Sequence, residues 1–269
     1  MDTSAAEQRI AKGKRTFVIE GEIAAGKTEL TKAIAAELTR RGKKVCLVLE
    51  PVEQWRSIGI LQKFYSDPMR FGYGFQTYVF ASRVLEIEKA VSANPDADVF
   101  LLERSPASDQ IFMELQRGVI DPVEMEMYST WCDAYNLMLP IDFSNAKVLY
   151  LKTSLEHCME RLNSRHRDGE VISTKPKEKV ASATATGGVS IGYQKRLRRA
   201  HEAFLQGLNP GEFPFMPKSP FPISSVYAIE PALADGNFRD PGPERDRIIG
   251  AIVDTVEVLY SRSVSMERL

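Results

Sequence analysis

The chain has 269 residues, which suits one large domain or two small ones, and 43% of them are hydrophobic, enough for a sizeable core. The formal net charge is −1, so the overall charge gives no argument for binding to nucleic acid or to a membrane surface. No apolar run is long enough to span a bilayer, and we expect no membrane-spanning segment.

Cysteine usage and the first residues of the chain bear on the compartment. Cys46, Cys132 and Cys158 are far apart and form no Cys-x-x-Cys motif, which predicts free thiols in a reducing compartment, the cytoplasm. Residues 1–15 are polar and lack the apolar segment of a secretory signal. We expect residues 1–14 to form a flexible tail.

The first predicted elements are a strand, a loop, a helix and a second strand. Thr16–Glu20 has the apolar pattern of a short buried strand. Residues Glu29–Arg41 carry apolar side chains at helical spacing and are followed by Gly42, which is typical of a helix end. A second strand is predicted over Lys43–Glu50, where the continuous apolar run is typical of strands covered on both faces.

The loop between the first strand and the helix fits the phosphate-binding pattern G-x-x-x-x-G-K-[ST]. Its glycines permit a tight bend and a close approach to a phosphate, and its N–H groups form an anion-binding nest. Lys27 is placed to reach the β- and γ-phosphates of a nucleotide, and the Thr28 hydroxyl to help hold Mg²⁺. The alternative is a glycine-rich turn before an ordinary helix. The motif consists of Gly21, Glu22, Ile23, Ala24, Ala25, Gly26, Lys27 and Thr28.

The remaining segments alternate between helix and strand. A helical stretch from Ile58 to about Ala93 is predicted to break near Asp67-Pro68 and again over residues 72–74. Small polar residues over 175–188 predict an exposed loop, and residues 210–222 are proline-rich and irregular. The further predicted strands are 99–102, 146–151 and 225–229, and the further helices are 108–118, 122–139, 154–165 with Ser154 as N-cap, 191–205 and 245–260.

This alternation predicts a doubly wound α/β domain with a parallel sheet. Ligands of such sheets bind beyond the carboxyl ends of the strands. The phosphate-binding loop, Glu50 and the triplet Glu103-Arg104-Ser105 each follow a predicted strand. The sequence therefore places its polar motifs along one edge of the sheet.

Five short motifs in order resemble the deoxynucleoside kinase family: GEIAAGKT from Gly21, EPVEQW from Glu50, FQTY from Phe75, ERS from Glu103 and RLNSRHR from Arg161. The resemblance implies a P-loop kinase fold, with a five-stranded parallel sheet flanked by helices and an arginine-rich lid at about residues 161–192. It implies one kinase domain over residues 15–269. The implied reaction is transfer of the γ-phosphoryl of ATP, with Mg²⁺, to the 5′-hydroxyl of a deoxynucleoside.

The resemblance assigns the reacting groups. Glu50 matches the general base, and Arg104 matches the arginine that holds the 5′ oxygen and orients Glu50. Glu103 matches an acid near Mg²⁺ or the sugar. The alternatives are a solvated carboxylate before Pro51 and an exposed Glu–Arg pair of little energetic value.

The resemblance also assigns a nucleoside pocket. Gln76 matches the glutamine that reads the base edge through its paired donor and acceptor. Tyr65 matches a tyrosine at the sugar 3′-hydroxyl, and Trp55 a wall of the sugar pocket. For the aromatic residues, core packing is the alternative. The further pocket-wall or base-stacking residues are Phe64, Phe75 and Phe112.

Base preference is implied by Arg83 and Asp109, which match the kinases for deoxycytidine and purine deoxynucleosides, where the pair faces the base. Val79 departs from the deoxycytidine kinase pattern, which has a smaller residue, and is similar to the insect multisubstrate enzyme. Purine deoxynucleosides and deoxycytidine are therefore the favoured substrates.

Arg161, Arg165 and Arg167 match the lid arginines that bring charge to the transferring phosphoryl group. A solvated basic end of a helix is the alternative. Glu170 matches a lid acid that contacts the sugar. The segment between Arg167 and Tyr193 is longer than the resemblance predicts, which puts the roles of Glu170 and Tyr193 in question.

The basic run over residues 195–199 is predicted to be a solvated helix face rather than a nucleic-acid site. The histidines show no zinc-binding spacing with the cysteines. The resemblance implies a homodimer formed through segments 76–93 and 122–139, although their aromatic and Met content also fits core packing. The competing functions are a nucleoside monophosphate kinase of the thymidylate kinase type and a non-catalytic nucleotide-binding module.

Overall fold

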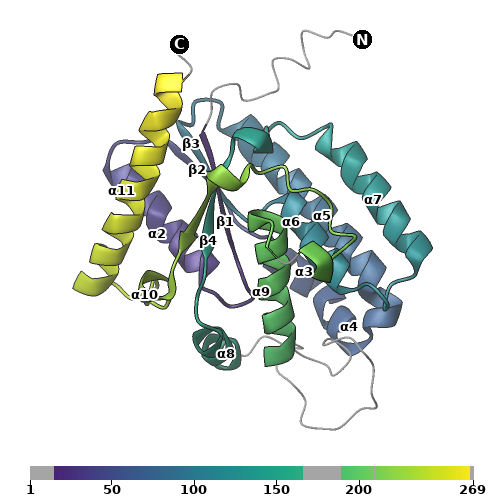
Figure 1. Cartoon of the computed structure of the whole chain (residues 1–269). Coiled ribbons are helices and arrows are strands. Elements are labelled where there is room, and N and C mark those ends of the chain that lie inside the picture. Colours follow the sequence, from purple (N-terminus) through teal and green to yellow (C-terminus); the bar gives the residue numbers. More distant parts are fainter. Residues whose placement is uncertain (1–14, 166–188, 209, 267–269) are drawn as a thin grey trace, which may run out of the picture.

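A parallel sheet of five strands lies at the centre of the structure, a computed structural model that describes residues 15–165, 189–208 and 210–266 (Figure 1). The strand order is β2-β3-β1-β4-β5, and every neighbouring pair is parallel. This confirms the predicted five-stranded α/β sheet. The strands are β1 (Arg15–Gly21), β2 (Val45–Val48), β3 (Val99–Glu103), β4 (Lys147–Leu151) and β5 (Val226–Ile229).

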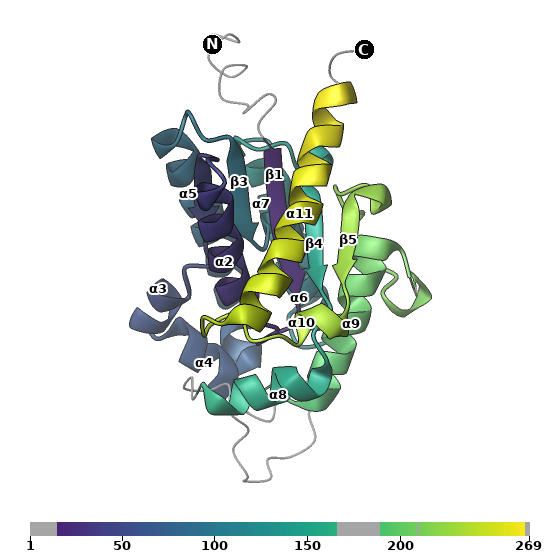
Figure 2. The same cartoon turned by 90° about the vertical axis from the view of Figure 1, so that its left-hand side faces the viewer.

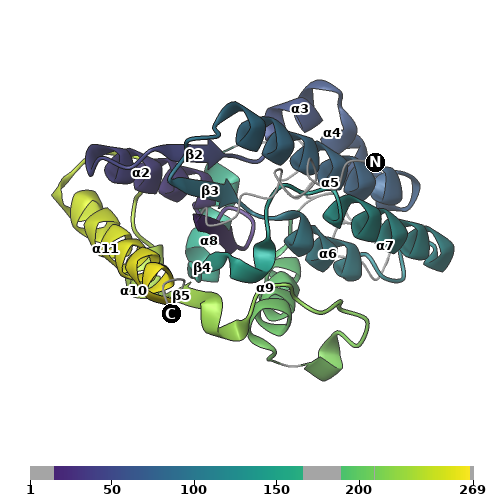
Figure 3. The ribbon, with the colours of Figure 1, turned by 90° about the horizontal axis from the view of Figure 1, so that it is seen from above.

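Helices cover both faces of the sheet, as its continuous apolar strands require. Phe17 and Ile19 of β1 join the core beneath α2 and α11, whereas Val18 joins the core beneath α5, α6 and α9. Figure 3 shows these two layers of helices, with α7 packed outside α5 and α6. The helices are α2 (Lys27–Arg40), α5 (Pro68–Ala93), α6 (Pro106–Leu115), α7 (Pro122–Asn136), α9 (Ile191–Gln206) and α11 (Pro243–Met266).

Short helices gather at the end of the molecule where the strands finish, at the bottom of Figure 2. They follow β2, β4 and β5 in the sequence, so they lie at the carboxyl edge of the sheet. These elements are α3 (Val52–Ser57), α4 (Ile60–Ser66), α8 (Leu155–Ser164) and α10 (Pro231–Ala234), and the single 3₁₀ turns elsewhere are η1 (Phe143–Asn145), η2 (Pro210–Glu212) and η3 (Ile223–Ser225).

Helix boundaries follow the capping residues. Ser154 accepts a hydrogen bond from the backbone N–H of His157, which confirms the predicted N-cap of α8. The prediction that α6 begins at Ser108 is wrong, because Ser105 caps the helix and Pro106 occupies its first turn. The predicted second strand is also too long, since β2 occupies only Val45–Val48.

The predicted helix break over residues 72–74 is wrong, because α5 continues through both glycines. A glycine inside a helix costs only about 1 kcal/mol relative to alanine, and tertiary packing overrides it. A Cβ on Gly72 would lie 3.2 Å from the Cγ1 atom of Ile120. Gly72 therefore allows the chain after α6 to approach α5 closely.

The predicted loop over residues 175–188 lies outside the described residues, as does most of the predicted lid. In the part of the chain that the structure describes, no helix combines the length and apolar character needed to cross a membrane.

Candidate active site

A cavity of about 1010 Å³ opens at the carboxyl edge of the sheet. Its walls come from the phosphate-binding loop, helices α3 to α6 and α8, and the chain after α10, so segments far apart in sequence share it. Gly21, Glu22 and Ala25 do not line it, and Arg167 and Glu170 lie outside the described residues. The predicted site residues that line the cavity are Ile23, Ala24, Gly26, Lys27, Thr28, Glu50, Trp55, Phe64, Tyr65, Phe75, Gln76, Val79, Arg83, Glu103, Arg104, Asp109, Phe112, Arg161 and Arg165.

The loop between β1 and α2 has the backbone geometry that phosphate binding needs. Gly26 adopts a φ of 101°, which strongly favours glycine. Gly21 is required for another reason, because a Cβ there would lie 2.7 Å from the backbone oxygen of Leu151. Lys27 Nζ donates to the backbone oxygens of Gly21 and Glu22 at 3.2 and 2.8 Å. Burial and nearby Arg104 lower the pKa of Lys27 to about 8, against the opposing effect of neighbouring carboxylates.

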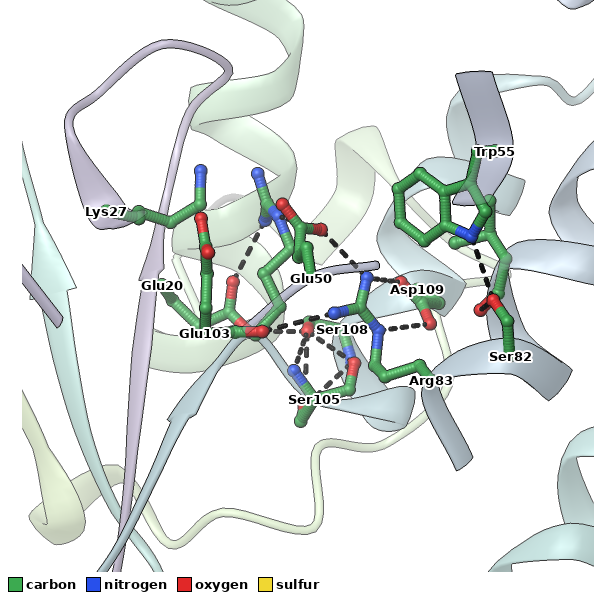
Figure 4. A network of polar contacts seen from close by, with 12 residues as sticks. Glu20, Lys27, Glu50, Trp55, Ser82, Arg83, Glu103, Ser105, Ser108 and Asp109 are labelled. Carbon is green, nitrogen blue, oxygen red and sulfur yellow. Dashed lines mark hydrogen bonds and ion pairs between the residues drawn. The ribbon is translucent and has the colours of Figure 1, made fainter. Parts of the chain in front are cut away.

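Glu50 is a partly buried acid that lines the cavity and lies beside Arg83 (Figure 4). Its Oε1 atom lies 2.8 Å from Arg83 Nη2 and 3.3 Å from Arg104 Nε. Burial alone would raise the pKa of Glu50, but the charges of Arg83, Arg104 and Lys27 outweigh burial and lower the pKa to about 2. Glu50 is therefore an ionised hydrogen-bond acceptor at neutral pH, and the alternative of a solvated carboxylate is wrong.

Arg83 and Asp109 form a buried pair beside Glu50. The Nε and Nη2 atoms of Arg83 donate to the two carboxylate oxygens of Asp109 at 2.9 and 3.0 Å. Burial raises the pKa of Asp109 to about 6, and the repulsion from Glu50 adds to this rise, while Arg83 opposes it. The two side chains form the pair that the resemblance implies, and both line the cavity.

Glu103 is the last residue of β3 and Arg104 follows it; both are buried, which excludes the alternative of an exposed pair. The hydroxyl of Thr28 donates to Glu103 Oε1 at 2.7 Å, and burial together with Glu50 raises the pKa of Glu103. Arg104 has a φ of 64°, a conformation that costs a non-glycine residue of order 1–3 kcal/mol. Its guanidinium group donates to Glu20 Oε2 at 3.0 Å and to the Gly21 backbone oxygen at 2.8 Å, which offsets that strain.

Aromatic side chains form the wall of the cavity beyond Glu50. Phe64 and Phe75 stack with ring centroids 4.4 Å apart, and Trp55 meets Phe75 edge-on. The Trp55 Nε1 atom donates to Ser82 Oγ at 2.9 Å, which fixes the indole against α5 (Figure 4). Gln76 is buried and lines the same part of the cavity. These aromatic residues both line the cavity and belong to the hydrophobic core, so a place in the pocket wall and core packing do not exclude each other.

Comparison with known proteins agrees with this geometry. A family model described as deoxynucleoside kinase matches residues 17–231. The chain belongs to the deoxynucleoside kinase family. It is 31% identical to a probable deoxycytidine kinase of fowlpox virus over 245 residues, which cover 90% of this chain and 88% of that protein. It is 28% identical to deoxycytidine kinase 2 of Gallus gallus, over 71% of this chain and 74% of that protein. It is 29% identical to a thymidine kinase of Ictalurid herpesvirus 1, over 70% of this chain and 73% of that protein.

The chain is therefore a deoxynucleoside kinase, an enzyme that phosphorylates deoxynucleosides, and ATP is the typical donor of this family. This decides against the two competing functions, a nucleoside monophosphate kinase and a binding module without catalysis.

Sequence reasoning missed part of the kinase cavity. Residues 235 and 237–240 line it beside the phosphate-binding loop and α8. Arg161 holds this segment in place, because its Nη2 donates to the backbone oxygens of Asp235 and Gly236 at 3.1 and 2.8 Å. These residues follow β5 in the sequence. The rule that ligands bind beyond the carboxyl ends of parallel strands, which singled out Glu50, applies to them as well.

The basic run on α9 differs in part from the predicted solvated face. Arg199 is exposed and pairs with Glu212, as the solvated-face prediction requires. The prediction is wrong for Arg198, whose Nε donates to the buried carboxylate of Glu22 at 2.8 Å. Tyr193, which the sequence left in question, is buried and lines the cavity.

We expect Arg83→Met to be destabilising in a pH-dependent way. Removing one partner of a buried pair costs about 3–5 kcal/mol. The raised pKa of Asp109 contributes stability at low pH that is lost as pH rises from its ordinary value of 3.8 through about 6. Without Arg83 that pKa rises further, so the variant continues to lose stability between pH 6 and 8, by about 1.4 kcal/mol for each unit of added shift.

Urea unfolding at pH 6 and pH 8 measures this effect. The control is Arg83→Met with Asp109→Asn, which removes the titrating group and should abolish the extra loss. An equal destabilisation by Arg83→Met at both pH values would contradict the prediction.

Proposed function

We propose that this kinase transfers the γ-phosphoryl group of ATP to the 5′-hydroxyl of a deoxynucleoside with Glu50 as the general base. The observation that supports this most is the position of the Glu50 carboxylate, which is ionised and shared by Arg83 and Arg104. Glu50 accepts the hydroxyl proton as the 5′ oxygen attacks the γ-phosphorus, and ADP leaves. Arg104 stabilises the reacting oxygens.

The donor phosphates lie in the loop at Gly21–Thr28 in this proposal. Lys27, which now contacts two loop carbonyls, exchanges them for phosphate oxygens. Arg161 and Arg165 line the same side of the cavity and add positive charge at the transferring group. Arg167 and Glu170 keep the roles that the family resemblance gives them, as lid residues within the single kinase domain.

Mg²⁺ fits the residues next to the loop. The Thr28 hydroxyl and the Glu103 carboxylate are adjacent oxygen donors, the type that Mg²⁺ prefers when it also binds phosphates. Bound there, the cation would neutralise charge on the β- and γ-phosphates. Other protein ligands need not be numerous, because Mg²⁺ keeps several waters.

The nucleoside occupies the aromatic part of the cavity in this proposal. Gln76 reads the base edge, Tyr65 and Trp55 border the sugar, and Arg83 with Asp109 limits the space beside the base. Phe64, Phe75, Phe112 and Val79 complete the wall. Deoxycytidine and purine deoxynucleosides are the proposed substrates. Relatives named as deoxycytidine kinase and as thymidine kinase both align with this chain, so a direct assay has to decide.

The proposed substrate range is tested by ATP- and Mg²⁺-dependent phosphorylation of deoxyadenosine, deoxyguanosine, deoxycytidine, thymidine and thymidine monophosphate. We expect the highest kcat/KM with deoxycytidine or a purine. Arg83→Met combined with Asp109→Ala should raise kcat/KM for thymidine, about tenfold or more, because it opens space beside the base. No gain for thymidine in the double variant would refute the proposed pocket.

Glu50→Gln tests the proposed base. The amide keeps the shape of the side chain but cannot accept the proton, so we expect kcat to fall about 100-fold or more while ATP binding changes less than about threefold. Glu86→Gln, at a half-buried position of α5 that does not line the cavity, is the matched control. Retention of kcat within about threefold in Glu50→Gln would remove Glu50 from the mechanism.

We also propose a homodimer formed through α5 and α7. Both helices expose large apolar side chains, which a second copy of the chain would cover. On α5 they are Met69 and Leu85, and on α7 they are Val123, Met127 and Trp131.

Sedimentation velocity at micromolar concentration tests this interface. We expect a dimer for the wild type and a monomer for Trp131→Glu, because a buried charge without a partner opposes association. Val258→Glu, at an equally exposed position on α11, should leave the dimer intact. A monomeric wild type would end the proposal.

A further inference from the structure

Helix α9 contacts the phosphate-binding loop and its neighbours through three polar side chains. Gln194 Nε2 donates to the Ile23 backbone oxygen at 2.7 Å, and Arg198 Nε donates to Glu22 Oε1 at 2.8 Å. One turn further along, His201 Nε2 lies 3.2 Å from Arg104 Nη1. Because these positions are four and three residues apart, they share one face of the helix. The catalytic edge of the sheet is thus connected to α9 at three points.

Glu22 is the unexpected member of this arrangement, because it places a carboxylate in a loop that binds anions. The side chain is fully buried and does not line the cavity, so the carboxylate lies behind the loop. Its Oε1 atom accepts hydrogen bonds from Tyr150 and Arg198 at 3.0 and 2.8 Å. Its Oε2 atom is buried without a hydrogen-bond partner in the described part of the chain.

The charge of Glu22 is retained because Arg198 faces it. Burial acts to raise the pKa of Glu22, but the hydrogen bond from Arg198, the nearby His201 and the charge of Arg198 together outweigh burial, and the pKa is lowered. The other groups near the carboxylate include Tyr150 on β4 and His201 on α9. Arg198 is thus the closest full positive charge to Glu22.

Arg198 also reaches the far end of the loop. One guanidinium nitrogen, Nη2, donates to the Thr153 backbone oxygen. The Thr153 hydroxyl in turn donates to the Ala25 backbone oxygen at 2.8 Å. Arg198 therefore contacts Glu22 directly and is connected to Ala25 through Thr153, while Arg161 Nη1 donates directly to the Ala25 backbone oxygen at 2.7 Å.

We propose that Glu22 and Arg198 are positioning residues for donor binding. Their ion pair fixes the loop backbone against α9 and cancels the negative charge that Glu22 would otherwise place behind the ATP phosphates. Neither residue touches a substrate. The inference rests on the proposed function in one respect, that the loop at Gly21–Thr28 binds the donor phosphates.

The test is the effect of Arg198→Met on each substrate separately. Removing the cation leaves a buried, uncompensated carboxylate behind the loop, so we expect KM for ATP and the calorimetric Kd for MgATP to rise tenfold or more. The nucleoside site is on the other side of Glu50, so KM for the nucleoside should change less than twofold. A general loss of structure would not separate the two KM values in this way.

The double variant Glu22→Gln with Arg198→Met removes both charges and should recover most of the lost ATP affinity. Arg198→Lys keeps the charge but loses the bridge to Thr153, and should show a smaller rise in KM for ATP. Arg199→Met is the matched control on the same helix, because Arg199 forms an exposed pair, and it should behave as the wild type. Thermal unfolding of each variant reports whether it is folded, and Arg198→Lys provides the measurement if Arg198→Met is not.

The outcomes separate this proposal from the one on which it rests. Wild-type protein that binds MgATP, with unchanged ATP affinity in both Arg198 variants, overturns the role of the ion pair alone. A double variant no better than Arg198→Met overturns the charge compensation. Wild-type protein that neither binds MgATP nor phosphorylates a nucleoside overturns the proposed function itself.

Discussion

A charge buried in a protein interior must be neutralised by a partner, and the catalytic edge of this sheet is built on that constraint. Acidic and basic side chains alternate there in one connected series, so each guanidinium group touches two carboxylates. In order, the series is Asp109, Arg83, Glu50, Arg104 and Glu20. Losing one member of such a series leaves an unpaired charge, so we expect the effects of substituting these residues to be coupled.

The series contains more acids than bases, and the excess is not spread evenly. Glu50, between two arginines, keeps a pKa of about 2, whereas the pKa of terminal Asp109 rises to about 6. The pKa of Glu103, next to Lys27 but repelled by Glu50, is raised as well. The pKa of Glu20, at the other end of the series, is lowered, because the nearby His201 and Arg104 outweigh the effect of burial. Glu50 and Glu20 therefore stay ionised, and the raised pKa values fall on Asp109 and Glu103.

The sequence predicted the site as far as short-range rules reach. The strand–loop–helix pattern located Lys27 and Thr28, and the position after a buried strand located Glu50, Glu103 and Arg104, because a parallel sheet brings its carboxyl ends together. Glu22 and Arg198 are 176 positions apart, and no local pattern connects them. The predicted break at Gly72 failed for the same reason, since the contact with Ile120 that favours glycine there is visible only in the folded chain.

The shared contacts of Arg83 imply that base recognition and catalysis are not independent in this enzyme. Arg83 Nη2 lies 2.8 Å from Glu50 Oε1 and 3.0 Å from Asp109 Oδ1. One nitrogen atom therefore contacts both the proposed general base, Glu50, and the proposed specificity residue, Asp109. Any movement of Arg83 towards the edge of the nucleobase weakens its hydrogen bond to Glu50 and raises the pKa of the Glu50 carboxyl group. In the proposed mechanism, a nucleoside that engages Arg83 and Asp109 therefore also raises the basicity of Glu50, the group proposed to accept its proton. A pocket without Arg83 would admit other nucleobases. In such a variant only Arg104 and Lys27 would remain of the three positive charges that lower the pKa of Glu50.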